Sequence, residues 1–180
     1  MTMWVFGYGS LLWNPGFPVA QSVVATLPGY ARSFCMRSIH HRGTVADPGL
    51  VLALDELAEA TCEGLALAVA EGHETQTLAM LRERELVSSA YLEKDLIVTP
   101  KGGAPVTAPV TAVTYVIDAD HEQYCGGLAL EEQARIIARA VGGRGPNTEY
   151  LFNTTAHLAG IGLHDSDLEW LTARVRALVG

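Results

Sequence analysis

The sequence predicts one α+β domain with a small, mainly antiparallel, barrel-like sheet and flanking helices. Three observations predict it. Segments with strand character fill most of the chain up to residue 117, one amphipathic helix interrupts them, and helical patterns take over from residue 129. Strands first and helices last, without regular alternation, are typical of α+β folds. A chain of 180 residues is long enough for a single domain, 1–180, with its own core.

Segments rich in β-branched and aromatic residues are expected to form the sheet. These expected strands lie at 3–8, 22–27, 30–37, 49–54, 64–69, 91–99 and 106–117. Pro28-Gly29 is a turn pair, so we expect the second and third strands to be separated by a turn. The Gly- and Pro-containing segment 101–105 is expected to be a loop.

Four segments carry apolar spacing or end signals typical of helices. They are expected at 73–86, at 129–141, from Asn147 to about 158, and from Ser166 onward. Gly142-Gly143 is expected to stop the second helix. Asn147 is the expected N-cap of the third, and Ser166-Asp167-Leu168-Glu169 is interpreted as a capping box for the fourth.

Composition and charge exclude several classes of function. The net charge is −8, whereas binding to nucleic acid or to an anionic membrane requires a basic face. No apolar stretch reaches the roughly 18–20 residues of a membrane helix, and the N-terminus lacks the pattern of a secretory signal. Three widely spaced cysteines fit reduced thiols. We therefore expect a cytoplasmic protein that binds a small molecule.

The first strand breaks at Gly7-Tyr8-Gly9-Ser10 and returns at once to apolar residues. A dinucleotide-binding fingerprint would need a third glycine where Leu12 stands, followed by a long helix, which Pro15 and Gly16 oppose. Small residues at a strand end let the backbone approach a ligand, and successive N–H groups can converge on an anionic oxygen. The alternative is a structural turn with Tyr8 packed in the core, and spacing alone favours that alternative.

Among the acids, Glu85 has the best case for a chemical role. It is expected at the C-terminal end of helix 73–86, which is the negative end of the helix dipole. Partial burial there would further disfavour the ionised carboxylate and raise its pKa, which suits acid–base catalysis near neutrality. The nearby Glu83 is interpreted as part of a solvated charge run.

The histidines and cysteines give weaker signals. His40 and His41 are adjacent, so on a strand they would face opposite sides and share a metal poorly. The other histidines lack the spacing of metal ligands, so we expect no metal. His121 and Cys125 could form a nucleophile pair on a helix, but Gly126-Gly127 favours a loop there.

Four motifs occur in a specific order along the chain: Phe6-Gly7-Tyr8-Gly9-Ser10-Leu11, Ser38-Ile39-His40-His41-Arg42-Gly43, Arg84-Glu85 and Asn147-Thr148-Glu149-Tyr150-Leu151-Phe152. Together they resemble the ChaC-type, glutathione-specific gamma-glutamylcyclotransferases, and the resemblance runs from about Trp4 to the last helix. The first motif belongs to the wider cyclotransferase superfamily, and its combination with the last is specific to the ChaC branch. The resemblance implies a closed or nearly closed sheet with flanking helices, and neither a metal nor an organic cofactor.

The reaction that the resemblance implies is intramolecular. The α-amine of a γ-glutamyl group attacks its own γ-carbonyl, 5-oxoproline closes, and with glutathione the leaving part is cysteinylglycine. Glu85 matches the family's catalytic glutamate, so it is expected to be both base and acid. The resemblance places the γ-glutamyl group against the turn, where amide donors would stabilise the oxyanion. The expected substrate contacts are therefore Val5, Phe6, Gly7, Tyr8, Gly9, Ser10, Leu11 and Tyr150.

Several alternatives remain open at this point. Tyr150 matches the family's late tyrosine and is expected to meet substrate through its hydroxyl, or it is simply a buried helix aromatic. Arg42 is expected to meet a substrate carboxylate or to pair with Asp47. The spacer from Glu85 to Tyr91 differs from the short Gly-rich spacer of eukaryotic members. The acidic net charge offers no long-range attraction for an anionic tripeptide, so we expect modest affinity. Other γ-glutamyl substrates, or a non-catalytic binding domain, are the rival functions.

Overall fold

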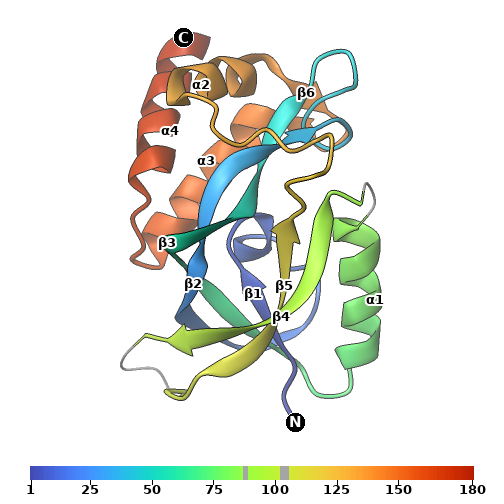
Figure 1. Cartoon of the computed structure of the whole chain (residues 1–180). Helices are drawn as coiled ribbons and strands as arrows, with labels where there is room; N and C mark the ends of the chain where they lie inside the picture. Colours follow the sequence, from blue (N-terminus) through green and yellow to red (C-terminus); the bar gives the residue numbers. More distant parts are fainter. Residues whose placement is uncertain (87–88, 102–105) are drawn as a thin grey trace.

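The computed structural model describes residues 1–86, 89–101 and 106–180, and it contains a closed β-barrel flanked by helices (Figure 1). Around the barrel the strand order is β1-β3-β2-β4-β5. Every neighbouring pair is antiparallel except β1 with β5, which pair in parallel. The predicted α+β class with a mainly antiparallel, barrel-like sheet is confirmed. The strands are β1 (Trp4–Gly7), β2 (Val19–Ser38), β3 (Gly49–Val69), β4 (Tyr91–Pro100) and β5 (Val110–Ile117).

The helices occupy two separate places on the barrel. Helix α1 (Glu74–Glu85) packs alone along one side, while α2 (Leu130–Arg139), α3 (Asn147–Gly160) and α4 (Ser166–Val179) gather near the C-terminus (Figure 1). In the described part of the chain, no helix has the length and apolar character needed to cross a membrane. The predicted loop at 101–105 lies outside the described residues except for its first position, as do residues 87–88 of the spacer after Glu85.

Strands β2 and β3 are each longer than expected, and this corrects two sequence predictions. Pro28-Gly29 lies inside β2 at a register shift and does not form a turn: Pro28 pairs with Thr61 and Tyr30 with Glu56, so the extra residues of the irregularity are on β3. Gly29 takes a positive φ of 85°, which glycine adopts without steric cost. Likewise 49–54 and 64–69 belong to the one strand β3. The long ribbon of β2 and β3 continues beyond the barrel towards the three C-terminal helices (Figure 1).

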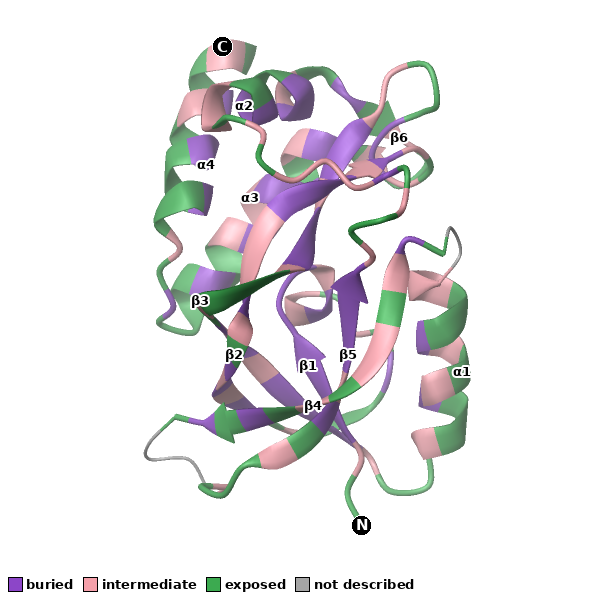
Figure 2. Ribbon diagram, viewed as in Figure 1, coloured by how far each residue is buried: buried purple, intermediate pink, exposed green. Residues whose placement is uncertain are grey.

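The core lies on both sides of the short strand β1. All four of its residues are buried (Figure 2). Phe6 belongs to the main cluster inside the barrel, whereas Val5 faces the second cluster with Leu81 of α1 and Tyr115 of β5. Successive side chains on a strand point to opposite faces, so an all-apolar strand indicates burial on both. β1 is therefore packed on both faces, which fixes the start of the turn that follows it.

Two predicted helix starts differ from the structure. Asn147 is the first residue of α3 and makes no capping bond; its amide donates to the carbonyl of Leu50 and accepts from the Leu50 N–H, both at 2.8 Å. At α4 the cap is Asp165, whose carboxylate accepts from the Leu168 N–H at 3.1 Å. At α3 a tertiary partner takes the amide that was expected to cap the helix, whereas at α4 the cap is local and lies one residue before the expected Ser166.

The glycines after α2 form a small hairpin. The helix ends at Arg139, and Val141–Gly142 (β6) pairs with Gly145–Pro146 (β7). Gly142-Gly143, which was expected to stop this helix, therefore lies beyond its end. The hairpin turn places Arg144 next to the loop that follows β2, because the N–H of Gly143 donates to His40 and that of Arg144 to His41.

Candidate active site

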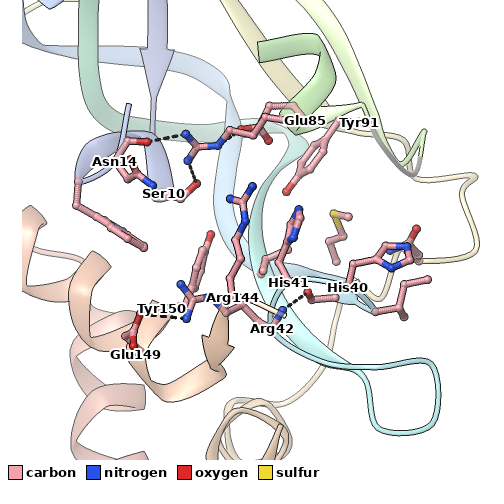
Figure 3. Close-up of a pocket in the computed structure, with 17 residues that line it drawn as sticks. Ser10, Asn14, His40, His41, Arg42, Glu85, Tyr91, Arg144, Glu149 and Tyr150 are labelled. Atoms are coloured by element: carbon pink, nitrogen blue, oxygen red, sulfur yellow. Dashed lines mark hydrogen bonds and ion pairs between the residues drawn. The ribbon is translucent and has the colours of Figure 1, made fainter. Parts of the chain in front are cut away.

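A cavity of about 300 Å³ opens where the end of α1, the turn after β1, the loop after β2 and the start of α3 converge (Figure 3). A smaller recess of about 30 Å³ adjoins it. Four residues line both spaces and therefore mark their junction: Ser10, Glu85, Tyr91 and Tyr150. The first, second and fourth of these were predicted from the sequence, and Tyr91 was not predicted as a site residue.

The turn after β1 forms one wall of the recess. Residues Ser10–Leu12 make one turn of 3-10 helix (η1), closed by the Leu12 N–H donating to the Gly9 carbonyl at 2.9 Å. The N–H of Gly9 bonds no acceptor among the described residues. A Cβ on Gly9 would stand 3.1 Å from the Tyr150 hydroxyl, which is a tight contact, so glycine at this position favours the close approach of α3. The turn therefore lines the recess with the backbone of Gly9, which has no side chain.

The structure separates the seven predicted contact residues from Val5 to Leu11 into two groups. Tyr8, Gly9, Ser10 and Leu11 line the recess. Tyr8 is also a core residue, since it is buried and its hydroxyl donates to the Tyr115 carbonyl at 2.8 Å. The strand residues Val5, Phe6 and Gly7 line neither space, because both faces of β1 are packed. Direct substrate contact by these three remains a prediction.

Glu85 is the last residue of α1, and its side chain is only 15% exposed. Burial raises the pKa of this carboxyl, and the positive charges of Arg84 and Arg144 oppose that rise. The carboxyl reaches the junction of cavity and recess from the α1 side (Figure 3). The geometry thus presents a buried acid, easier to protonate than usual, beside the backbone of the first turn.

Arg84 connects this acid to the turn, a role that the sequence did not reveal. Its Nε lies 3.4 Å from Oε1 of Glu85. Its Nη2 donates to Oγ of Ser10 at 2.9 Å, and its Nη1 donates to the Asn14 carbonyl at 2.6 Å (Figure 3). Arg84 stands in a run of alternating charges, which looks like a solvated helix face. In the sequence, only its position next to Glu85 in the motif indicated that Arg84 belongs to the site.

Two tyrosine hydroxyls bond the backbone of one residue of β3, Leu52. Tyr150, on the first turn of α3, accepts from the Leu52 N–H at 3.1 Å, and Tyr91 donates to the Leu52 carbonyl at 2.9 Å. Burial raises the pKa of both phenols, so both stay neutral at physiological pH. Tyr150 is therefore a buried helix aromatic that also lines the cavity, and contact of its hydroxyl with substrate stays a prediction.

Arg42 lines the cavity without the partner that was considered for it. Its Nη1 donates to the Pro146 carbonyl at 3.0 Å and lies 3.3 Å from Glu149. Asp47 pairs with Arg139 at 3.1 Å, so the suggested ion pair of Arg42 with Asp47 is wrong. The loop between β2 and β3 turns Asp47 toward α2 and leaves Arg42 on the cavity side.

Three arginines and two histidines line the cavity, together with two glutamates. They are Arg42, Arg84, Arg144, His40 and His41, with Glu85 and Glu149. The cavity is thus locally cationic although the chain as a whole carries a net charge of −8. Net charge alone pointed the other way, because it averages over surface residues far from the site.

The thiols lie outside this site. Cys35, Cys62 and Cys125 are free, and none lines the cavity or the recess in the described part of the chain. Residues 118–128 contain no helix, which confirms the loop expected around His121 and Cys125. Burial raises the pKa of the Cys125 thiol, and that of Cys35 to about 12, so neither is an activated nucleophile.

Comparison with known proteins places the chain in a family. The sequence profile described as ChaC-like protein matches residues 3–178, nearly the whole chain. The chain belongs to the ChaC-like family. One relative of this ChaC-like protein is the Escherichia coli (strain K12) glutathione-specific gamma-glutamylcyclotransferase, 34% identical over 98% of this chain and 74% of that protein. Another is the Arabidopsis thaliana gamma-glutamylcyclotransferase 2-3, 34% identical over 99% of this chain and 91% of that protein.

A solved structure has the same fold. The yeast gamma-glutamyl cyclotransferase specific to glutathione superposes with a TM-score of 0.86, covering 98% of this chain and 96% of that chain. The sequence identity in that comparison is 22%. The ChaC-like fold, with its closed barrel and flanking helices, is therefore common to both proteins.

Proposed function

We propose that this protein is a gamma-glutamylcyclotransferase that converts glutathione to 5-oxoproline and cysteinylglycine. The observation that carries the proposal is the position of Glu85, a buried carboxyl at the junction of the cavity and the recess formed by the first turn. Two relatives that align over almost the whole chain carry names with this activity, and that of the Escherichia coli protein specifies glutathione. The three free cysteines support action in the cytoplasm, where thiols stay reduced.

Proton transfer is the first demand of the reaction. The α-ammonium group of the substrate loses two protons as its nitrogen becomes the lactam nitrogen, and the departing nitrogen gains two as it becomes the ammonium group of cysteinylglycine. One carboxyl between these atoms can act as base for the first group and as acid for the second. Burial raises the pKa of Glu85, which brings its two protonation states closer in free energy near neutral pH.

Charge on the carbonyl oxygen is the second demand. The recess of about 30 Å³ has room for one small polar group and no more. We assign the γ-carbonyl oxygen to it, facing the unpartnered N–H of Gly9. A fixed amide donor at a developing oxyanion typically contributes roughly 10²–10³-fold in rate.

Folding the substrate back on itself is the third demand. Amine and carbonyl must approach to about 3–3.5 Å before the ring can close. The junction is narrow because Tyr91 and Tyr150 both line it, and their hydroxyls are held by the backbone N–H and carbonyl of Leu52. The cysteinylglycine part then lies in the larger cavity, with its arginines and histidines.

Turnover of three substrates tests the proposal. The protein is incubated with glutathione, gamma-glutamyl-alanine and gamma-glutamyl-lysine, and 5-oxoproline is measured by mass spectrometry. We expect release from glutathione. Preference for either of the other compounds would indicate a cyclotransferase of different specificity, and no release from any would indicate a binding domain.

A pair of glutamine variants tests the role of Glu85. Glu85→Gln keeps the size of the side chain and removes the base, so kcat for glutathione should fall by about 10²–10⁴-fold. Glu74→Gln changes the same residue type at the opposite end of α1 and should leave kcat unchanged. Full activity of Glu85→Gln would refute the mechanism.

A further inference from the structure

The three arginines of the cavity differ in how their guanidinium groups are used. Arg42 bonds Pro146 and Glu149, and Arg84 bonds Ser10 and Asn14 beside Glu85. The guanidinium of Arg144 makes no hydrogen bond or ion pair with any of the described residues. We propose that Arg144, together with His41, forms the subsite that binds a carboxylate of the substrate. This inference rests on the proposed function.

The hairpin holds Arg144 in place although its side chain is exposed. The Arg144 N–H donates to the His41 carbonyl at 2.9 Å, and the Gly143 N–H donates to the His40 carbonyl at 2.8 Å. A Cβ on Gly142 would collide with the backbone of Arg42 and Gly43, so this approach requires glycine. The backbone under Arg144 is therefore fixed to the same loop that carries His41, and only the side chain must be ordered on binding.

His41 supplies a second and independent indication of a ligand. Its Nε2 is buried, and of the buried side-chain nitrogen and oxygen atoms of the described residues it is the one without a hydrogen-bond partner. Buried polar atoms are nearly always paired, so an unpaired one in a cavity wall indicates a partner that binds there. Burial, followed by the charge of Arg144, lowers the pKa of His41, so the ring is neutral near pH 7. A neutral imidazole can still donate one hydrogen bond to a carboxylate oxygen.

The surroundings favour an anionic group between these two side chains. Arg144, His41 and Glu85 line the same cavity (Figure 3). The charge of Arg144 lowers the pKa of His41 and opposes the rise in the pKa of Glu85. A substrate carboxylate near Glu85 would be repelled unless a cation stood beside it. Arg144 also borders a more open hollow of about 540 Å³ that adjoins the cavity.

Glutathione has two carboxylates that meet this description. One is attached to the carbon that bears the reacting amine, and the other ends the leaving dipeptide. The binding chemistry is the same for both, because a guanidinium forms strong, often bidentate bonds with any carboxylate. Analogues in which one carboxylate at a time is converted to an amide distinguish them.

The experiment compares wild type with Arg144→Gln on glutathione, its C-terminal amide and its γ-glutamyl α-carboxamide. Loss of a hydrogen bond to a charged group corresponds to about a 10–100-fold fall in kcat/KM for glutathione. The ratio of wild type to variant should fall below about threefold for the analogue that lacks the bound carboxylate, and stay large for the other. Comparing ratios within each substrate cancels differences in intrinsic reactivity. His41→Phe should show the same selectivity, and Arg144→Lys should restore part of the activity.

Arg139→Gln is the matched control. Arg139 is an exposed arginine five residues away that pairs with Asp47 on the surface, and its loss should leave all three ratios near one. Equal ratios for Arg144→Gln on all three compounds, whether large or near one, would overturn the carboxylate subsite.

A binding measurement separates failure of the subsite from failure of the proposed function. Absence of 5-oxoproline from wild type with glutathione would reject the function. Calorimetric titration of the same three compounds into Glu85→Gln protein, with and without Arg144→Gln, tests the subsite without turnover. We expect Arg144→Gln to weaken binding of glutathione about 10–100-fold and to leave one amide analogue nearly unaffected. Uniform weakening, or none, would overturn the subsite here as well.

Discussion

Substitution of Asn147 gives the strongest single test of the contacts that hold the site together. Its amide takes the place of a neighbouring strand for Leu50: one bond goes to the Leu50 N–H and one to its carbonyl, each 2.8 Å long. Both residues are completely buried. Tyr150 lies three residues further along the same helix, so this anchor also positions the hydroxyl that faces the recess.

The magnitude follows from the two bonds. Asn147→Ala leaves a buried N–H and a buried carbonyl of β3 without partners, at about 1–3 kcal/mol each. The expected loss is therefore about 2–6 kcal/mol, out of a total stability of roughly 5–15 kcal/mol. For a chain of this length each kcal/mol lowers Tm by about 2–4 °C. We expect Tm to fall by at least about 4 °C, with reduced kcat/KM in the folded fraction.

Thermal and urea unfolding measure the effect, and Asn153→Ala is the control. Asn153 lies on the same helix and is only partly buried, and its side chain makes no hydrogen bond within the described residues. Because alanine has the higher helix propensity, the control should be neutral or slightly stabilising. If the two variants lost the same stability, the two bonds to Leu50 would not anchor α3.

Three further predictions concern the site. Burial raises the pKa of Glu85 in the folded state, so the wild type loses stability as pH rises from the unfolded pKa through the folded one. In urea unfolding, Glu85→Gln should therefore be as stable as the wild type at pH 4 and more stable than it at pH 7. An equal difference in stability at both pH values would contradict this. Gly9→Ala places a methyl group 3.1 Å from the Tyr150 hydroxyl and should lower kcat/KM at least about tenfold. The control Gly160→Ala places its methyl group in open space and should leave kcat/KM unchanged. Equal kinetics of the two variants would argue against the close approach of Gly9 and Tyr150. Iodoacetamide at pH 7 should leave activity intact, because burial raises the pKa of all three thiols and none of them lines the cavity. Rapid inactivation that substrate prevents would instead indicate a role for a cysteine.

Local features of the fold were predictable because they depend on neighbours in sequence. Helix α1 was expected at 73–86 and occupies Glu74–Glu85, so the position of Glu85 at its end followed from apolar spacing. Pro28-Gly29 was misinterpreted because the same pair suits a turn and an irregular position within a strand. The partner strand β3, which continues past it, decides between them.

By itself the sequence determined the barrel class, the first turn with its glycines, and the acid at the end of α1. Only the tertiary structure decided which charges face the cavity: Arg84 meets Ser10 across 74 positions, and Arg144 reaches the same space from a hairpin beyond α2. Periodicity and capping encode contacts over a few residues, while these meetings exist only after the barrel closes. An arginine on a solvated helix face and one that contacts a carboxyl in a cavity are therefore the same in sequence and differ only in what the fold places opposite them.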